Sequence, residues 1–227
     1  GTPSAINIFS GIEPACQTAG SEITTYTTSA TNSTGFNWSV SNALAGNINP
    51  ITGEMAWASG FSGSVDIRVT ANGCNGPSAL VTRTVSITPA VGIPSAINIF
   101  SGTEPTCQTA GSEITTYTTT ATNSTGFNWS LSNALAGNIN PTTGEMAWAS
   151  GFSGSVDIQV TANGCNGTSA MVTRTINITP AVGTPSAINI FSGTEPTCQT
   201  SGTEITSYST SATNSTGFNW SVSNALA

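Results

Sequence analysis

Five cysteines at regular spacing are the residues of this chain best suited to covalent chemistry. They are Cys16, Cys74, Cys107, Cys165 and Cys198. The first two lie 58 residues apart (16 to 74), and the next two repeat that separation (107 to 165). Paired cysteines in a chain with no histidine and no CxxC motif are typical of disulfides formed in an oxidising compartment, and a zinc site needs more ligands. We therefore predict structural disulfides, no bound metal and no cofactor.

The other side chains that could take part in catalysis argue against an enzyme. The chain has no histidine and no lysine, which removes the usual general bases and Schiff-base nucleophiles. The carboxylates near the N-terminus are Glu13, Glu22, Glu54 and Asp66. Two of them could form a glycosidase pair, but solvated surface acids are the better interpretation. We predict that the chain is not an enzyme.

The aromatic residues predict a packed core. Trp38 alternates with polar residues in phase with Phe36 and Val40, and Trp57 does the same with Met55. Period-two alternation places such side chains on the buried face of a strand. The tryptophans that we expect in the core are Trp38, Trp57, Trp129, Trp148 and Trp220.

A long internal repeat sets the organisation of the chain. The decamer that begins at Gly1 returns, with one substitution, at Gly92 and, unchanged, at Gly183. The two complete copies differ at only 11 of 91 positions, so both should fold alike. We predict a first repeat, Gly1–Val91, a second repeat, Gly92–Val182, and a third repeat, Gly183–Ala227, that holds the first half only.

Within a repeat the pattern is one of short strands separated by turns. Residues 36–41, 53–58 and 65–70 alternate between apolar and polar side chains, and turn signals such as Asn75-Gly76 stand between such segments. Further strands are expected near Ile6, over 22–30 and over 79–88. Six or seven strands at this spacing predict an all-β fold, a tandem array of immunoglobulin-like β-sandwich domains.

Arg83 does not fit this pattern. It stands in phase with the apolar residues Val81, Val85 and Ile87. Either a bulge turns it outward, or it is partly buried in an ion pair with Asp66 or Glu54.

The order of these motifs resembles a known kind of domain. Cys16, Tyr26, the segment Phe36–Val40 and the segment Ala71–Gly76 follow one another as in the PKD-like and immunoglobulin-like repeats of large secreted surface proteins (adhesins) of the Bacteroidetes. The resemblance covers every repeat. It implies export to the cell surface, often by the type IX route, and service as a stalk or adhesin segment.

The charge of the chain limits the kinds of partner that it can bind. The net charge is −7 and the only cations are Arg68, Arg83 and Arg174, so no basic patch could neutralise nucleic-acid phosphates. No apolar run is long enough to enter a membrane. The expected partners are neighbouring repeats and other copies of the chain in an extracellular fibre. The alternative is a carbohydrate-binding or other surface-binding module that stacks exposed aromatic rings on sugars. Core packing explains the tryptophans better, and the pattern does not assign Phe9 and Phe61, which fall near turns.

Two disulfide patterns are compatible with the strand order. Bridges within repeats would join Cys16 to Cys74 and Cys107 to Cys165, leaving Cys198 over. A bridge across the junction would join Cys16 to Cys165, because the first cysteine and the hairpin cysteine of a sandwich lie at opposite ends. The Cα atoms of a disulfide are only about 4.4–6.8 Å apart, so a single sandwich cannot satisfy both patterns. We favour the bridges within repeats, since strand ends are the least certain part of a sequence-based prediction.

Overall fold

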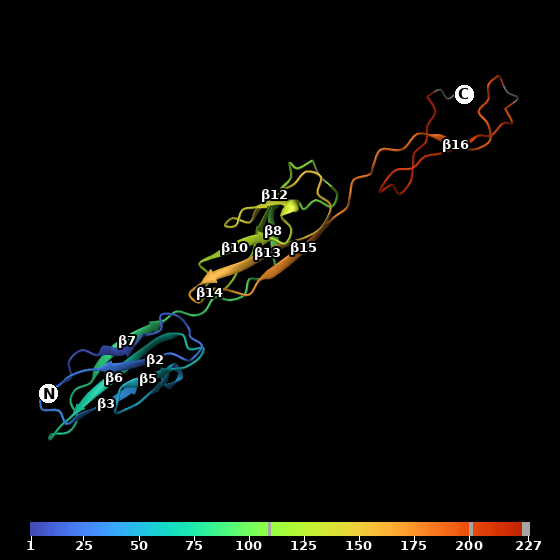
Figure 1. Ribbon diagram of the computed structural model, residues 1–227. Helices are drawn as coiled ribbons and strands as arrows, with labels where there is room; N and C mark the ends of the chain where they lie inside the picture. Colours follow the sequence, from blue (N-terminus) through green and yellow to red (C-terminus); the bar gives the residue numbers. More distant parts are fainter. Residues whose placement is uncertain (109, 200–201, 224–227) are drawn as a thin grey trace.

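The molecule is an extended array of bodies in a row, one for each sequence repeat (Figure 1). The computed structural model describes residues 1–108, 110–199 and 202–223. The first two bodies are β structures with separate hydrophobic cores, and a single stretch of chain connects each body to the next. The N-terminus lies at one end of the array, and the third repeat lies at the other (Figure 1).

The first repeat is a sandwich of two antiparallel sheets. One sheet has the order β1-β2-β5-β4 and the other has the order β3-β6-β7. The predicted strand segments all appear, and the structure adds a 3-10 turn and a short strand over residues 43–48, which we did not predict. The elements are β1 (Asn7–Gly11), β2 (Ile23–Thr27), β3 (Gly35–Val40), η1 (Ala43–Ala45), β4 (Gly46–Ile48), β5 (Glu54–Trp57), β6 (Gly63–Asn72) and β7 (Val81–Ile87).

The apolar side chains that alternate with polar ones along the strands form the core. In β6 every second side chain from Val65 to Ala71 is buried, and the residues between them are partly exposed. β6 pairs with both β3 and β7, so it is the central strand of its sheet. The buried residues of the first core include Trp38, Met55, Trp57 and Ile67. Burial of these side chains is the main force that holds the two sheets together.

The second repeat has the same architecture. Its sheets have the orders β11-β12-β9-β8 and β10-β13-β14, with β15 paired to β13. A short extra strand, β14, lengthens the hairpin that follows β13. The elements are β8 (Asn98–Gly102), β9 (Ile114–Thr118), β10 (Gly126–Leu131), η2 (Ala134–Ala136), β11 (Gly137–Ile139), β12 (Glu145–Trp148), β13 (Gly154–Gly164), β14 (Gly167–Thr168) and β15 (Val172–Ile178).

The third repeat forms only a two-stranded ribbon in its described part. β16 (Asn189–Ser192) pairs with β17 (Ser207–Ser209) in the register that β1 and β2 use in the first repeat. Trp220 was expected in a core, but it is 51% exposed. The strands that bury the equivalent Trp38 and Trp129 come from the second half of a repeat, and residues 183–223 contain only first-half positions.

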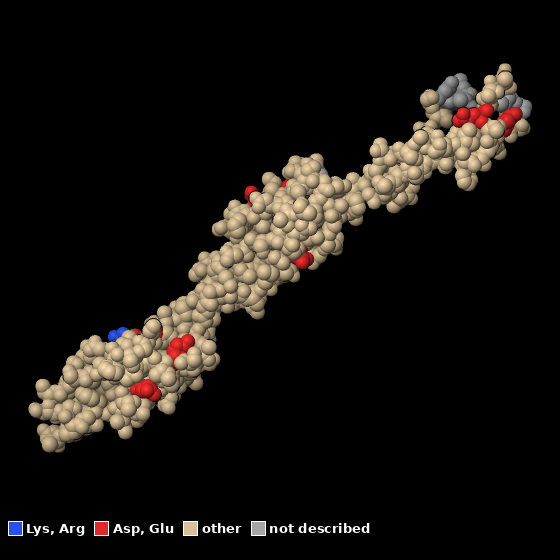
Figure 2. Space-filling view, viewed as in Figure 1, with Lys and Arg blue, Asp and Glu red and all other residues tan. Residues whose placement is uncertain are grey.

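The surface carries very little charge. On the face seen in Figure 2, acidic side chains form isolated spots and most of the surface is uncharged. Only 6% of the residues are charged, so serine, threonine and asparagine supply most of the polar surface.

Candidate functional site at the junction between repeats

Cys16 is held at the end of the first sandwich that faces the second repeat. It forms an isolated parallel bridge with Thr88, the residue after β7. The Gln17 amide donates to the Thr88 carbonyl at 2.8 Å, and the Thr88 amide donates to the Ala15 carbonyl at 2.9 Å. These bonds fix the cysteine beside the point where the chain leaves for the next repeat.

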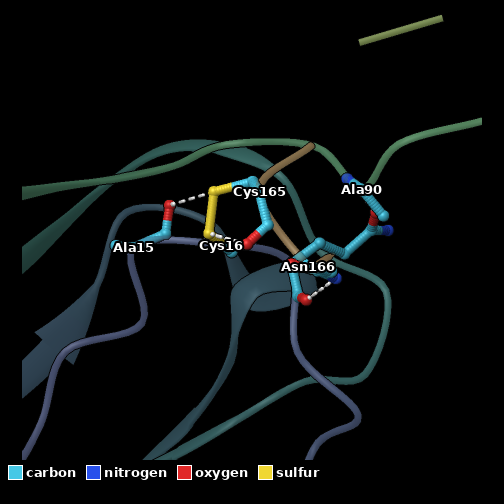
Figure 3. The surroundings of a disulfide bond; sticks show 6 residues. Ala15, Cys16, Ala90, Cys165 and Asn166 are labelled. Carbon is cyan, nitrogen blue, oxygen red and sulfur yellow. Dashed lines mark hydrogen bonds between the residues drawn. A yellow bond between two sulfur atoms is a disulfide. The ribbon is translucent and has the colours of Figure 1, made fainter. Parts of the chain in front are cut away.

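Cys165 lies at the tip of the hairpin between β13 and β14. Cys165 and Asn166 form the turn, and Gly167 has a φ of +92°, in the left-handed region that glycine adopts without strain. This tip is the end of the second sandwich that faces the first repeat (Figures 1 and 3). The hairpin therefore brings a cysteine to the junction from the opposite side.

The two cysteines form a disulfide across the junction. The Cα atoms of Cys16 and Cys165 are 5.6 Å apart, and their sequence separation is 149 residues. The neighbouring Asn166 side chain donates a hydrogen bond to the Gln17 carbonyl (Figure 3). One covalent bond and one hydrogen bond thus join the hairpin tip to the loop of the preceding repeat.

The linker is tied to both repeats. The Ala90 amide donates to the Gln17 side chain, and the Ala90 carbonyl accepts from the Asn123 side chain, each at 2.9 Å. Val91 packs so closely on the hairpin that a Cβ added at Gly164 would lie 2.5 Å from the Val91 Cβ. A residue larger than glycine at position 164 would push the hairpin away from the linker.

This arrangement corrects our preferred pairing. Cys16 is bonded to Cys165, and the bridges Cys16–Cys74 and Cys107–Cys165 do not form. Cys74 and Cys107, which the favoured pattern placed in disulfides, are free and exposed in the described chain, and so is Cys198, which that pattern left over. The reason is topological: the first cysteine of a repeat and its hairpin cysteine lie at opposite ends of one sandwich, as the second of our two patterns requires.

The tryptophans of the complete repeats lie in the cores. Trp38, Trp57, Trp129 and Trp148 are each 5% exposed or less. The Trp57 indole N–H donates to the Thr24 hydroxyl at 2.9 Å, and this hydroxyl donates to the Ile12 carbonyl at 2.8 Å. Packing and hydrogen bonding therefore account for these four rings, and none of them offers a flat exposed face.

An ionic cluster forms around Glu13 in the first repeat. The Arg83 guanidinium donates to both carboxylate oxygens of Glu13, at 2.6 and 2.8 Å, and the Tyr26 hydroxyl donates to the same carboxylate at 3.0 Å. Of the two alternatives for Arg83, the partly buried ion pair is present, but its partner is Glu13 and not Asp66 or Glu54. Glu13 and Arg83 are 70 residues apart, so no local pattern connects them. The one signal in the sequence was that Arg83 stands in phase with the buried residues of its strand.

The cluster shifts the ionisation of its members. Burial raises the pKa of Glu13, but the hydrogen bonds from Arg83 and Tyr26 together with the Arg83 charge outweigh this effect, and the net pKa lies below its ordinary value. Burial and the adjacent Glu13 carboxylate raise the pKa of Tyr26 well above its usual range. Glu13 is therefore a charged structural anchor near neutral pH.

Within residues 1–108, 110–199 and 202–223, no group of three or more histidine, cysteine, aspartate or glutamate side chains could hold a metal ion. The same residues include no helix of the length and apolar character needed to cross a membrane.

Comparisons with known proteins give structural similarity only. No protein-family model matches the chain, and no curated protein matches it. The solved structures that resemble it include a fragment of mouse cadherin-23, EC22-24 (TM-score 0.47, 14% identity, covering 81% of this chain and 69% of that one). They also include a C-terminal 282-residue fragment of intimin in complex with the translocated intimin receptor (0.39, 15%, 84% and 67%). A third is Sidekick-1 immunoglobulin domains 1-5 (0.43, 13%, 84% and 41%).

The chain is an array of immunoglobulin-like β-sandwich repeats. The two antiparallel sheets of each complete repeat, with the buried tryptophan on the third strand, carry this assignment. At such low sequence identities the similar structures add nothing about ligands or activity.

Proposed function

We propose that this chain is a structural and adhesive segment of a secreted surface protein, a stalk in which disulfides connect neighbouring repeats. The units of the stalk are residues 1–91, 92–182 and 183–227. The observation that carries the proposal is the bond between Cys16 and Cys165, which joins two separately packed repeats. A disulfide of this kind belongs in an oxidising compartment, in keeping with the cell exterior.

The bond changes how the stalk carries tension. A force applied to the two ends of the chain passes from residue 16 to residue 165 through the sulfur atoms. The intervening residues, which include most of both cores, lie outside the loaded path. Both sandwiches could then unfold while the stalk lengthens by only a small amount. Such a bond suits a segment that holds an adhesive tip at a distance under load.

Single-molecule stretching tests this proposal. The oxidised chain, held at its two termini, should extend fully to a contour length about 500 Å shorter than the reduced chain, because an unfolded stretch of 149 residues spans at most about 3.3–3.6 Å per residue. The variant Cys16→Ser should show the long extension without reductant. The matched control is Cys74→Ser, which changes an exposed free thiol. This variant should keep the short extension of the oxidised chain. Equal extension of the oxidised chain and Cys16→Ser would contradict the proposal.

A surface-binding role is the second candidate, and exposed phenylalanines favour it. Phe9, Phe100 and Phe191 are 75%, 75% and 78% exposed. Each lies where the register shifts between its neighbours, at a bulge in the first strand of its repeat, and a bulge of this kind redirects a side chain. Exposed rings at a constant sequence interval could stack on a polysaccharide. The triple variant with serine at these positions should then lose adsorption to cellulose or chitin, and equal adsorption would reject this candidate.

A further inference from the structure

The backbone at the first junction is hydrogen-bonded to both repeats. The Ala90 amide donates to the Gln17 side chain of the first repeat, and the Asn123 side chain of the second repeat donates to the Ala90 carbonyl, each at 2.9 Å. The Gly92 amide donates to the Thr122 carbonyl, also at 2.9 Å. Together these bonds fix the linker against both sandwiches, and we call Gln17, Thr122 and Asn123 the linker site.

The second junction has the same bonds without a disulfide. The Ala181 amide donates to the Gln108 side chain, and the Asn214 side chain donates to the Ala181 carbonyl, each at 2.9 Å. Cys107, which is the equivalent of Cys16 in the second repeat, is a free thiol in the described chain. The hydrogen bonds of the linker therefore form with or without a sulfur–sulfur bond beside them.

The linker contacts the residues next to both halves of the disulfide. Gln17 follows Cys16 in the sequence, and Gly164 precedes Cys165. A Cβ added at Gly164 would lie 2.5 Å from the Cβ of Val91, so the linker packs directly on the backbone of the hairpin. The position of the linker thus sets the positions of both cysteines.

We propose that the linker site and Gly164 align the two repeats before oxidation and thereby select Cys165 as the partner of Cys16. Gln17, Asn123 and Gly164 are positioning residues for the formation of this bond. The two cysteines are 149 residues apart, and closing so long a loop in a flexible chain is entropically unfavourable, so alignment in advance raises the effective concentration of the two thiols. The inference rests on the proposed function, and it deepens that function by naming the residues that specify the bond.

The covalent chemistry is a thiol–disulfide exchange with a small disulfide such as oxidised glutathione. The Cys16 thiolate attacks this oxidant, a mixed disulfide forms, and one glutathione leaves as its thiolate. The Cys165 thiolate then attacks the sulfur of Cys16, the bond between the repeats forms, and the second glutathione leaves. The two protein thiols are oxidised, and the glutathione disulfide is reduced to two thiols. Only the second step requires the two cysteines to be together, so only that step depends on the alignment.

Equilibration of the full chain with reduced and oxidised glutathione measures the effective concentration of Cys16 and Cys165, and peptide mapping follows this pair. Gly164→Ala should lower the effective concentration about tenfold, because the added methyl group pushes the hairpin away from the linker. The matched control is Gly73→Ala, at the equivalent hairpin position of the first repeat. A Cβ added at either glycine would lie close to a carbonyl oxygen, at 3.0 and 3.2 Å, but only the one at Gly164 would also meet the linker. The control should change the effective concentration by less than about twofold.

Two further variants remove the hydrogen bonds of the linker. Gln17→Ala and Asn123→Asp each remove one donor or acceptor, and each should lower the effective concentration about fivefold. Aspartate tolerates the positive φ of +56° at position 123. The controls Gln108→Ala and Asn214→Asp remove the same bonds at the second junction, so they should leave the Cys16–Cys165 equilibrium unchanged. Gln108 and Gln17 each also donate to a glycine carbonyl, so the loss of that contact is matched as well.

Hydrogen exchange separates alignment from folding. In the double variant Cys16→Ser/Cys165→Ser, the Ala90 amide should stay as protected as the Ala181 amide, which has the same hydrogen bond beside a free thiol. Gly164→Ala should leave exchange in β6 and β15 unchanged, because the substitution alters the junction and not the cores.

Two results would overturn the inference. One is an equal effective concentration of the two thiols in the wild type and in the variants Gly164→Ala, Gln17→Ala and Asn123→Asp. The other is rapid exchange of the Ala90 amide in the double serine variant. Either result leaves the Cys16–Cys165 bond in place, whereas the absence of this bond from the wild type in oxidised glutathione would overturn the proposed function as well.

Discussion

Arg83 and Glu13 anchor the first sandwich through an ion pair between two partly buried side chains. The Glu13 side chain is 18% exposed and the Arg83 side chain 35% exposed. Arg68 and Asp66 form a longer and more exposed pair, 3.4 Å apart, with side chains 37% and 34% exposed. The two pairs differ in burial and geometry, so they should contribute differently to stability.

Substitution of Arg83 should destabilise the first repeat. Arg83→Ala leaves a mostly buried carboxylate without its cation, and we expect a loss of about 1–2 kcal/mol, after allowance for the solvent that reaches the arginine. The matched control is Arg68→Gln, the residue found at the equivalent position 159, with an effect within about 0.5 kcal/mol. Hydrogen exchange in β6 reports the stability of this repeat alone. Equal losses in the two variants would reject the anchoring role.

The same cluster predicts a response to acid. The pKa of Glu13 is lower in the folded repeat than in the unfolded chain, where it is near 4.5. The carboxylate therefore stabilises the fold fully above that value, and this contribution is lost as the pH falls through the folded pKa. Exchange protection in β6 should fall more steeply between about pH 5 and about pH 3 in the wild type than in Glu13→Gln. Parallel pH profiles would show that Glu13 is not responsible.

The sequence predicts the individual strands and their buried faces better than it predicts contacts between distant segments. Alternation along Phe36–Ser41 and 65–70 predicts β3 and β6 together with their buried faces, because a period of two fixes which side chains point inward. The bulge at Phe9 and the partner of Arg83 depend on contacts between distant segments, and no local pattern specifies them. The cysteine pairing depends on which end of a sandwich each loop occupies, so the sequence could only reduce it to two alternatives.

Thr24 connects two elements through one hydroxyl. It lies on β2, accepts from Trp57 of β5 and donates to the carbonyl of Ile12 in the loop after β1. Thr24→Val keeps the volume but leaves a buried N–H and a carbonyl unpaired, so we expect a loss of about 1–3 kcal/mol. Thr25→Val, at the half-buried next residue, should change stability by less than about 0.5 kcal/mol. The loss of stability of each variant can be measured by hydrogen exchange in β6. Similar losses for both variants would show that the hydrogen bonds are dispensable.

At the scale of the whole molecule, the shape follows from junctions that hold each repeat at the end of the one before. The radius of gyration in solution should be well above the roughly 17 Å expected of a compact chain of this length. Cys16→Ser should broaden the distribution of interatomic distances without collapsing it, because the hydrogen bonds of Ala90 to Gln17 and Asn123 remain. Small-angle scattering gives both quantities. A compact particle for the wild type would contradict the extended array.

The bond that joins the repeats is the central claim, and non-reducing peptide mapping of the oxidised full chain tests it most directly. The chain has only three arginines and no lysine, so a protease other than trypsin is needed. We predict a linked peptide pair that contains Cys16 and Cys165, disappears on reduction, and is recovered from monomeric protein. A pair that joins Cys16 to Cys74, or free thiols at both Cys16 and Cys165, would contradict the account.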